Sequence, residues 1–146
     1  MIQNIVTNSY EETQKFGYDF VRKLERHNVL ALYGDLGSGK TTFVQGFAKG
    51  LGTHKKIISP TFIIMRTYEI NFKFQISNFK FFYHVDLYRI KEEYELKDLG
   101  ILDLIKDDQN LFAIEWPEKI EKFLPKKRIN LYFEYIDENK RKITII

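Results

Sequence analysis

The feature that most constrains this chain is a glycine-rich segment that runs from Gly34 to Thr41. It reads Gly-Asp-Leu-Gly-Ser-Gly-Lys-Thr and fills every fixed position of the pattern G-x-x-x-x-G-K-[ST]. The apolar run 29–33 precedes it and is typical of a strand that is buried on both faces. Apolar side chains at helical spacing follow it over residues 43–48. The order strand, glycine-rich turn and helix is the setting in which this pattern forms a phosphate-binding loop.

The spacing of this loop follows from what phosphate binding requires. Backbone N–H groups must converge on phosphate oxygens at close range, and glycine permits both the positive φ angles and the close approach. Lys40 is expected to reach the β- and γ-phosphates, and Thr41 to offer its hydroxyl to Mg²⁺. The following helix directs its positive N-terminal end at the anion. We therefore predict a nucleoside triphosphate site with Mg²⁺, whose loop residues are Gly37, Ser38, Gly39, Lys40 and Thr41.

Two further apolar runs end in a carboxylate. Residues 81–86 end at Asp86, and residues 111–115 end at Glu115. Ligands of open α/β sheets collect at the carboxyl ends of strands, so we predict that both side chains belong to the site. His84 lies two residues before Asp86 and therefore faces the same side of its strand. For either carboxylate the alternative is an ordinary surface residue, and for His84 it is a hydrogen-bonded core histidine.

The remaining patterns predict the fold class. Ser9 and Glu12 have the spacing of a capping box ahead of a helix over residues 10–27. Hairpins are expected over 63–86 and 129–146, with short helices between 91 and 108 that break at Gly100. Strands that alternate with helices early and form hairpins later predict an α/β protein: a P-loop NTPase fold with a mixed central β-sheet flanked by helices. We expect a single P-loop ATPase domain over residues 1–146.

Composition excludes several classes of protein. The chain has no cysteine, which removes disulfides and thiol catalysis. No apolar run approaches the roughly 18 residues that span a bilayer, and the first ten residues lack the basic and apolar regions of a signal peptide. We therefore expect a cytoplasmic protein without a membrane partner.

Several motifs together resemble one family. The phosphate loop is followed by Ser59-Pro-Thr-Phe62, by His84-Val-Asp-Leu-Tyr-Arg89 and by Glu115-Trp-Pro-Glu118. In this order and at these separations the motifs resemble the bacterial TsaE family, also called YjeE. The resemblance runs from about Ser9 to the C-terminal hairpin. These are small P-loop ATPases of tRNA threonylcarbamoyladenosine biosynthesis.

The resemblance implies a function. Proteins of this kind act as an accessory subunit with TsaB and TsaD in forming N6-threonylcarbamoyladenosine at position 37 of tRNAs that read ANN codons. It implies ATP and Mg²⁺ as cofactors, and contact with tRNA only through the complex. Intrinsic ATP hydrolysis should be slow, because the chain shows no clear built-in arginine finger, for which Arg89 is the nearest candidate. We expect the free protein to be a monomer.

The resemblance also assigns roles to individual residues. Lys40, Asp86 and Glu115 are the expected catalytic residues, and Thr41 and Glu115 the expected magnesium ligands. Asp86 would help to place the attacking water. Thr13 is assigned to the adenine side of the nucleotide, and Thr42 to the phosphates. Thr61 is assigned to the switch-like segment, and Trp116 is a functional aromatic near the nucleotide or partner surface. His84 is grouped with these switch and partner residues.

Two other functions remain open at this point. A small-molecule or nucleotide kinase shares the size and the loop, although the arginines of this chain form no cluster typical of a kinase lid. A non-catalytic ATP-sensing docking module would use bound ATP only to order the segment around Thr61 and the acidic stretch that follows Asp86. Residue patterns alone also leave Thr61 as an ordinary turn hydroxyl and Trp116 as a core aromatic.

Overall fold

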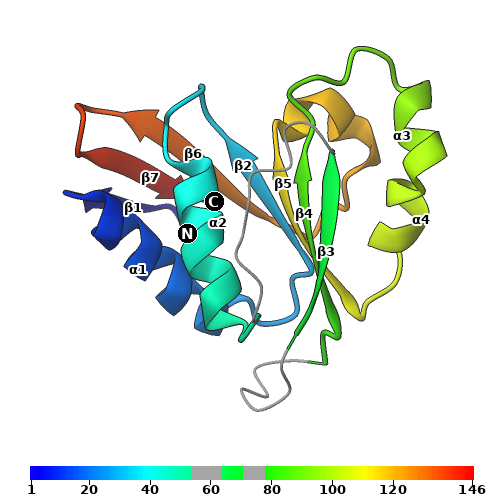
Figure 1. The fold of residues 1–146 in the computed structure, drawn as a ribbon, viewed down its shortest axis with the longest axis horizontal. Helices are drawn as coiled ribbons and strands as arrows, with labels where there is room; N and C mark the ends of the chain where they lie inside the picture. The colour runs from blue at the N-terminus through cyan, green and yellow to red at the C-terminus, as the bar shows by residue number, and fades with distance from the viewer. Residues whose placement is uncertain (54–63, 71–77) are drawn as a thin grey trace.

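The strands of the computed structural model, which describes residues 1–53, 64–70 and 78–146, form one mixed sheet. Its strand order is β1-β7-β6-β2-β5-β4-β3 (Figure 1). Strands β4, β5, β2 and β6 run parallel at the centre, and β3, β7 and β1 pair antiparallel at the two edges. The bounds are β1 (Gln3–Thr7), β2 (Val29–Tyr33), β3 (Met65–Glu69), β4 (Phe81–Asp86), β5 (Asn110–Glu115), β6 (Ile129–Tyr135) and β7 (Arg141–Ile145). The α/β class and the mixed sheet are thus confirmed.

Helices cover both faces of this sheet (Figure 1). Helices α1 (Tyr10–Phe20) and α2 (Lys40–Gly50), with the short η1 (Val21–Lys23), share one buried core with the sheet. A second core lies under α3 (Tyr94–Leu99), α4 (Ile101–Ile105) and η3 (Pro117–Phe123). The first core contains Leu30, Leu32, Leu111, Ala113 and Phe82, and the second contains their chain neighbours Val29, Ala31 and Phe112. This alternation explains why the central strands are apolar without interruption.

The register of the central strands decides what gathers at their carboxyl ends. Glu115 of β5 is the Cα partner of Leu32 in β2 on one side and of Asp86 in β4 on the other. The segment that follows β2 leads directly into α2, whose first residue is Lys40. Two carboxylates and the start of a helix therefore meet at one edge of the sheet, as the sequence predicts.

Most of the expected elements are confirmed. Ser9 caps α1, since its Oγ accepts the N–H of Glu12 at 3.1 Å. The break at Gly100 between α3 and α4 is present, with Gly100 at φ 68°. The hairpin of β3 and β4 forms, although the polar stretch expected to turn between them, residues 71–78, lies outside the described residues except for Asn78. Among the described residues no helix is long and apolar enough to cross a membrane.

Two expectations about the N-terminal region are corrected. Strand β1 was not expected from the sequence, because its residues are mostly exposed and only Thr7 is buried, so it carries no apolar alternation. The helix expected over 10–27 ends its α-helical part at Phe20 and continues as the 3-10 turn η1.

Helices α1 and α2 pack closely because glycines face the partner backbone. A Cβ placed on Gly46 of α2 would lie 1.8 Å from the carbonyl oxygen of Gln14 in α1. A Cβ on Gly17 of α1 would lie 2.2 Å from the carbonyl oxygen of Phe43 in α2. The helix that follows the phosphate loop is therefore positioned by backbone contact.

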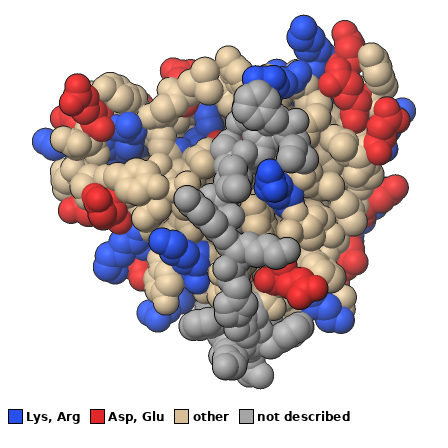
Figure 2. Space-filling view, viewed as in Figure 1, with Lys and Arg blue, Asp and Glu red and all other residues tan. Residues whose placement is uncertain are grey.

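Figure 2 shows that the opposite side of the molecule, where Figure 1 places α3 and α4, is rich in acidic side chains.

Candidate functional site

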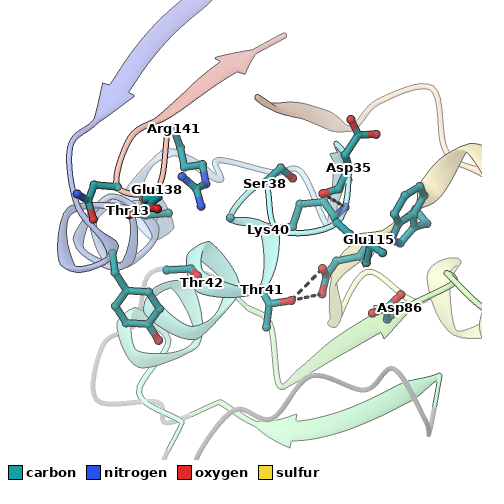
Figure 3. A pocket seen from close by; sticks show the side chains of 16 residues that line it. Thr13, Asp35, Ser38, Lys40, Thr41, Thr42, Asp86, Glu115, Glu138 and Arg141 are labelled. Atoms are coloured by element: carbon teal, nitrogen blue, oxygen red, sulfur yellow. Dashed lines mark hydrogen bonds between the residues drawn. The ribbon is translucent and has the colours of Figure 1, made fainter. Parts of the chain in front are cut away.

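A pocket of about 400 Å³ opens at the start of α2 (Figure 3). The glycine-rich segment forms its floor, and every residue from Asp35 to Thr42 lines it. Gly39 caps the helix with φ 102°, a backbone conformation that residues with a side chain rarely adopt. A Cβ on Gly39 would also lie 3.3 Å from Cγ of Arg141. The loop therefore needs glycine at this point for both reasons.

Lys40 is a buried cation at the centre of the pocket. Its side chain is 4% exposed, and its ammonium donates to the carbonyl oxygens of Gly34 and, at 3.2 Å, of Asp35. The ammonium also lies 4.2 Å from the ring centroid of Trp116. Burial lowers the pKa of Lys40, and the nearby carboxylates, Glu115 first, oppose that shift.

Glu115 joins the loop to the sheet (Figure 3). Thr41 Oγ1 donates to both of its carboxylate oxygens, at 3.0 Å and 3.2 Å. On the other side His84 Nε2 lies 2.6 Å from Glu115 Oε2. His84 is completely buried, so it holds the carboxylate from inside the sheet. The three side chains fix a hydroxyl and a carboxylate next to each other at the helix start.

Asp86 lies one strand away from Glu115. The two residues are Cα partners in parallel strands, so their side chains leave the same face of the sheet. Asp86 is 6% exposed and lines the pocket, and its Oδ1 accepts the N–H of Tyr88 at 2.9 Å. A second carboxylate therefore borders the same space.

The structure brings nearly all of the predicted residues together. The residues from Gly37 to Thr42, with Thr13, Asp86, Glu115 and Trp116, line the pocket, and His84 reaches it through Glu115. Trp116 has φ 59°, an uncommon backbone conformation of the kind that clusters at functional sites. Arg89 does not line the pocket. Thr61 lies outside the described residues.

Four pocket residues far from the loop in sequence were not anticipated. Tyr10 comes from the first turn of α1, and Glu138, Asn139 and Arg141 come from the β6–β7 hairpin. No motif marks them. They arrive through strand pairing, because Thr7 of β1 is the Cα partner of Arg141. Arg141 carries one unusual feature, a buried Nε–H that has no hydrogen-bond partner among the described residues.

Comparison with known proteins assigns the chain to a family. The family model described as "Threonylcarbamoyl adenosine biosynthesis protein TsaE" matches residues 7–143. The chain belongs to the TsaE family. It is 38% identical over 143 residues to the tRNA threonylcarbamoyladenosine biosynthesis protein TsaE of Rickettsia felis. This alignment covers 97% of this chain and 78% of that protein. The TsaE of Bacillus subtilis is 40% identical over 117 residues, or 80% of this chain and 68% of that protein.

A solved structure extends the TsaE likeness to three dimensions. The crystal structure of Bacillus subtilis YdiB superposes with a TM-score of 0.77 at 29% sequence identity, and covers 99% of this chain and 84% of that chain. The family resemblance deduced from the motifs is therefore confirmed, and so is the P-loop NTPase type of fold.

Proposed function

We propose that this TsaE-family chain is a Mg²⁺-dependent ATPase that acts as an accessory subunit with TsaB- and TsaD-type proteins. The product of the complex would be N6-threonylcarbamoyladenosine at position 37 of tRNAs that read ANN codons, with tRNA contacted only through the complex. The observation that carries the ATPase proposal is the phosphate loop that presents Lys40 and Thr41 beside the Glu115 carboxylate. The names of the family and of its relatives support the role in tRNA modification.

The loop supplies what triphosphate binding requires. The loop and the first turn of α2 line the pocket, and backbone N–H groups in such a turn are the donors that bind phosphate oxygens. The Lys40 ammonium would exchange the carbonyl oxygens of Gly34 and Asp35 for β- and γ-phosphate oxygens. Thr42 lines the same part of the pocket and would support the phosphates from the helix.

The residues present fit a magnesium ion. Thr41 Oγ1 and the Glu115 carboxylate are adjacent oxygen donors, the ligand type that Mg²⁺ prefers. Among the described residues no group of three or more His, Asp or Glu side chains would hold a metal without help. Mg²⁺ commonly relies on one or two protein ligands with phosphate oxygens and water. When bound, the ion would neutralise charge on the reacting phosphates.

Asp86 is the group that we assign to the attacking water. It lies beside Glu115 at the edge of the sheet and lines the pocket, so its carboxylate would accept a hydrogen bond from a water molecule bound there. His84 would act through Glu115 by holding its carboxylate in place. Trp116 contacts the Lys40 ammonium and would help to orient it.

The proposal is tested by following product and partners together. Purified chain with MgATP should release phosphate to water without labelling any acceptor, which separates an ATPase from a kinase. Added with ATP to TsaB- and TsaD-type proteins, tRNA, threonine, bicarbonate and the enzyme that makes the threonylcarbamoyl donor, the unaltered chain should raise the yield of modified adenosine, and Lys40→Ala should not. Transfer of phosphate to a small molecule, or a yield that does not depend on this chain, would contradict the proposal.

Replacing Glu115 by glutamine should separate binding from hydrolysis. The amide still accepts the Thr41 hydroxyl but has lost the charge that favours Mg²⁺, so we expect hydrolysis to fall about 10- to 100-fold and the Mg²⁺ concentration for half-maximal rate to rise. ATP affinity measured by calorimetry should change much less. Glu92→Gln is the matched control, since Glu92 is exposed and does not line the pocket. If Glu115→Gln fully supports tRNA modification, the chain is an ATP sensor.

A further inference from the structure

The end of the pocket away from Glu115 is built from two segments that are distant in sequence. The start of α1 contributes Tyr10 and Thr13, and the β6–β7 hairpin contributes Glu138, Asn139 and Arg141. Figure 3 shows Arg141 reaching from the β7 side toward Thr42. A nucleotide whose phosphates lie on the loop would extend its base toward this end. The chemistry of these side chains therefore bears on how the base is held.

Thr13 has little left to offer a ligand. Its Oγ1 donates to the carbonyl oxygen of Ser9 at 3.2 Å and lies 2.7 Å from Oγ1 of Thr7, which is then the donor of that pair. Both threonines are at least 97% buried, at 2% and 3% exposure. The single hydroxyl proton of Thr13 is therefore used inside the protein, where it ties α1 to β1. Its contribution to the pocket is to position this wall.

Tyr10, unlike Thr13, is exposed to a ligand in the pocket, and its side chain is held in place. The residue is 52% exposed, yet its hydroxyl donates to Oε1 of Gln45 at 2.5 Å and accepts from Nε2 of Gln14 at 3.0 Å. Nε2 of Gln14 also donates to Oε1 of Gln45 at 3.1 Å, which closes a ring of three polar groups between α1 and α2. An exposed tyrosine would otherwise move among several rotamers. These hydrogen bonds instead fix the aromatic ring of Tyr10 where it lines the pocket.

Arg141 supplies a polar group at the same end. Its Nη1 donates to the carbonyl oxygens of Asp137 and Lys140, at 2.6 Å and 2.9 Å, and its guanidinium lies 4.6 Å from the ring centroid of Tyr135. These contacts hold the guanidinium and leave the buried Nε–H without a partner among the described residues. A buried donor without an acceptor is uncommon in a folded protein, and the residue that carries it lines the pocket.

We infer that Tyr10 is the stacking surface for the base of the bound nucleotide, held for this purpose by Gln14 and Gln45. This rests on the proposed nucleotide function. A fixed aromatic ring binds a planar base through stacking at low entropic cost, because the ring is already ordered. The stacking is tolerant of base identity, so this wall selects nucleotides over inorganic polyphosphate rather than one purine over another. The guanidinium of Arg141, which lines the same end of the pocket, would be the adjacent donor for an acceptor on the ribose or base.

The test compares two ligands that differ by the nucleoside. Calorimetry with MgATP and with magnesium tripolyphosphate is carried out on the unaltered chain, Tyr10→Ala and Tyr10→Phe. Tyr10→Ala should bind ATP about tenfold more weakly and tripolyphosphate as well as the unaltered chain does. Tyr10→Phe keeps the ring and should stay within about threefold for ATP. Tyr18→Ala is the matched control, because Tyr18 is an exposed tyrosine of the same helix that does not line the pocket.

The role of Gln45 is tested by a double-mutant cycle. If Gln45 acts by holding the ring, Gln45→Ala should weaken ATP binding in the unaltered chain and have no further effect in Tyr10→Ala. The inference is wrong if Tyr10→Ala leaves ATP affinity within twofold, or if it weakens ATP and tripolyphosphate by the same factor. Equal effects of Gln45→Ala in both backgrounds would remove its positioning role. A failure of the unaltered chain to bind ATP would instead overturn the proposed function.

Discussion

Replacing Lys40 by alanine is expected to lower kcat/KM for ATP hydrolysis about 1,000-fold, the upper end of the loss seen when one catalytic donor is removed. Lys40 is the buried cation of a pocket that also contains Asp86 and Glu115. Without the ammonium, these carboxylates face the triphosphate with no fixed positive side chain between them. Binding should therefore weaken together with hydrolysis. Phosphate release and calorimetry on the same preparation measure both effects.

Lys119→Ala is the control that separates catalysis from loop structure. Its ammonium, like that of Lys40, donates to two backbone carbonyl oxygens, those of Tyr88 and Ile90, both at 2.7 Å. Lys119 does not line the pocket, so its loss should affect thermal stability and leave kcat/KM nearly unchanged. Hydrolysis within threefold of the unaltered rate in Lys40→Ala would mean that the phosphate loop does not bind the triphosphate as proposed.

What the sequence predicts well is the part of the site that is local in the chain. The loop from Gly34 to Thr41 is one continuous segment, and its spacing follows directly from phosphate geometry. Asp86 and Glu115 are predictable for a similar reason, because each ends a strand whose apolar run is visible in the sequence. Parallel pairing then places both at one edge.

At the end of the pocket away from Glu115 the family resemblance indicated only Thr13, because the other residues there are brought in by strand register. Tyr10 and Arg141 are 131 positions apart, and they line one pocket through the pairing of β1 with β7. Strand β1 itself has no apolar alternation from which it could be predicted, since it is an edge strand with one buried residue. The partner of Thr13 was hidden for the same reason, because Thr7 belongs to that strand. Long-range pairing, which local periodicity does not encode, decides these contacts.

Gly46→Ala is expected to destabilise the protein by about 3 kcal/mol, the upper range for overpacking of a core. The sign is opposite to that of helix propensity, because alanine in a helix interior is normally favoured over glycine by about 1 kcal/mol. Contact overrides propensity here. The new Cβ would lie 1.8 Å from the carbonyl oxygen of Gln14 and 2.6 Å from its carbonyl carbon, and backbone atoms cannot rotate away as a side chain would. Helices α1 and α2 would have to separate.

Thermal unfolding measures this prediction, and the midpoint should fall by about 6–12 °C. Lys49→Ala, at an exposed position of the same helix, should change the free energy of unfolding by less than about 0.5 kcal/mol. Because α2 begins at Lys40 and Gln45 holds Tyr10, separation of the helices should also weaken ATP binding in the molecules that remain folded. A variant as stable as the unaltered protein would show that α1 moves away from α2 without loss of unfolding free energy. This backbone contact would then not be what positions the phosphate loop.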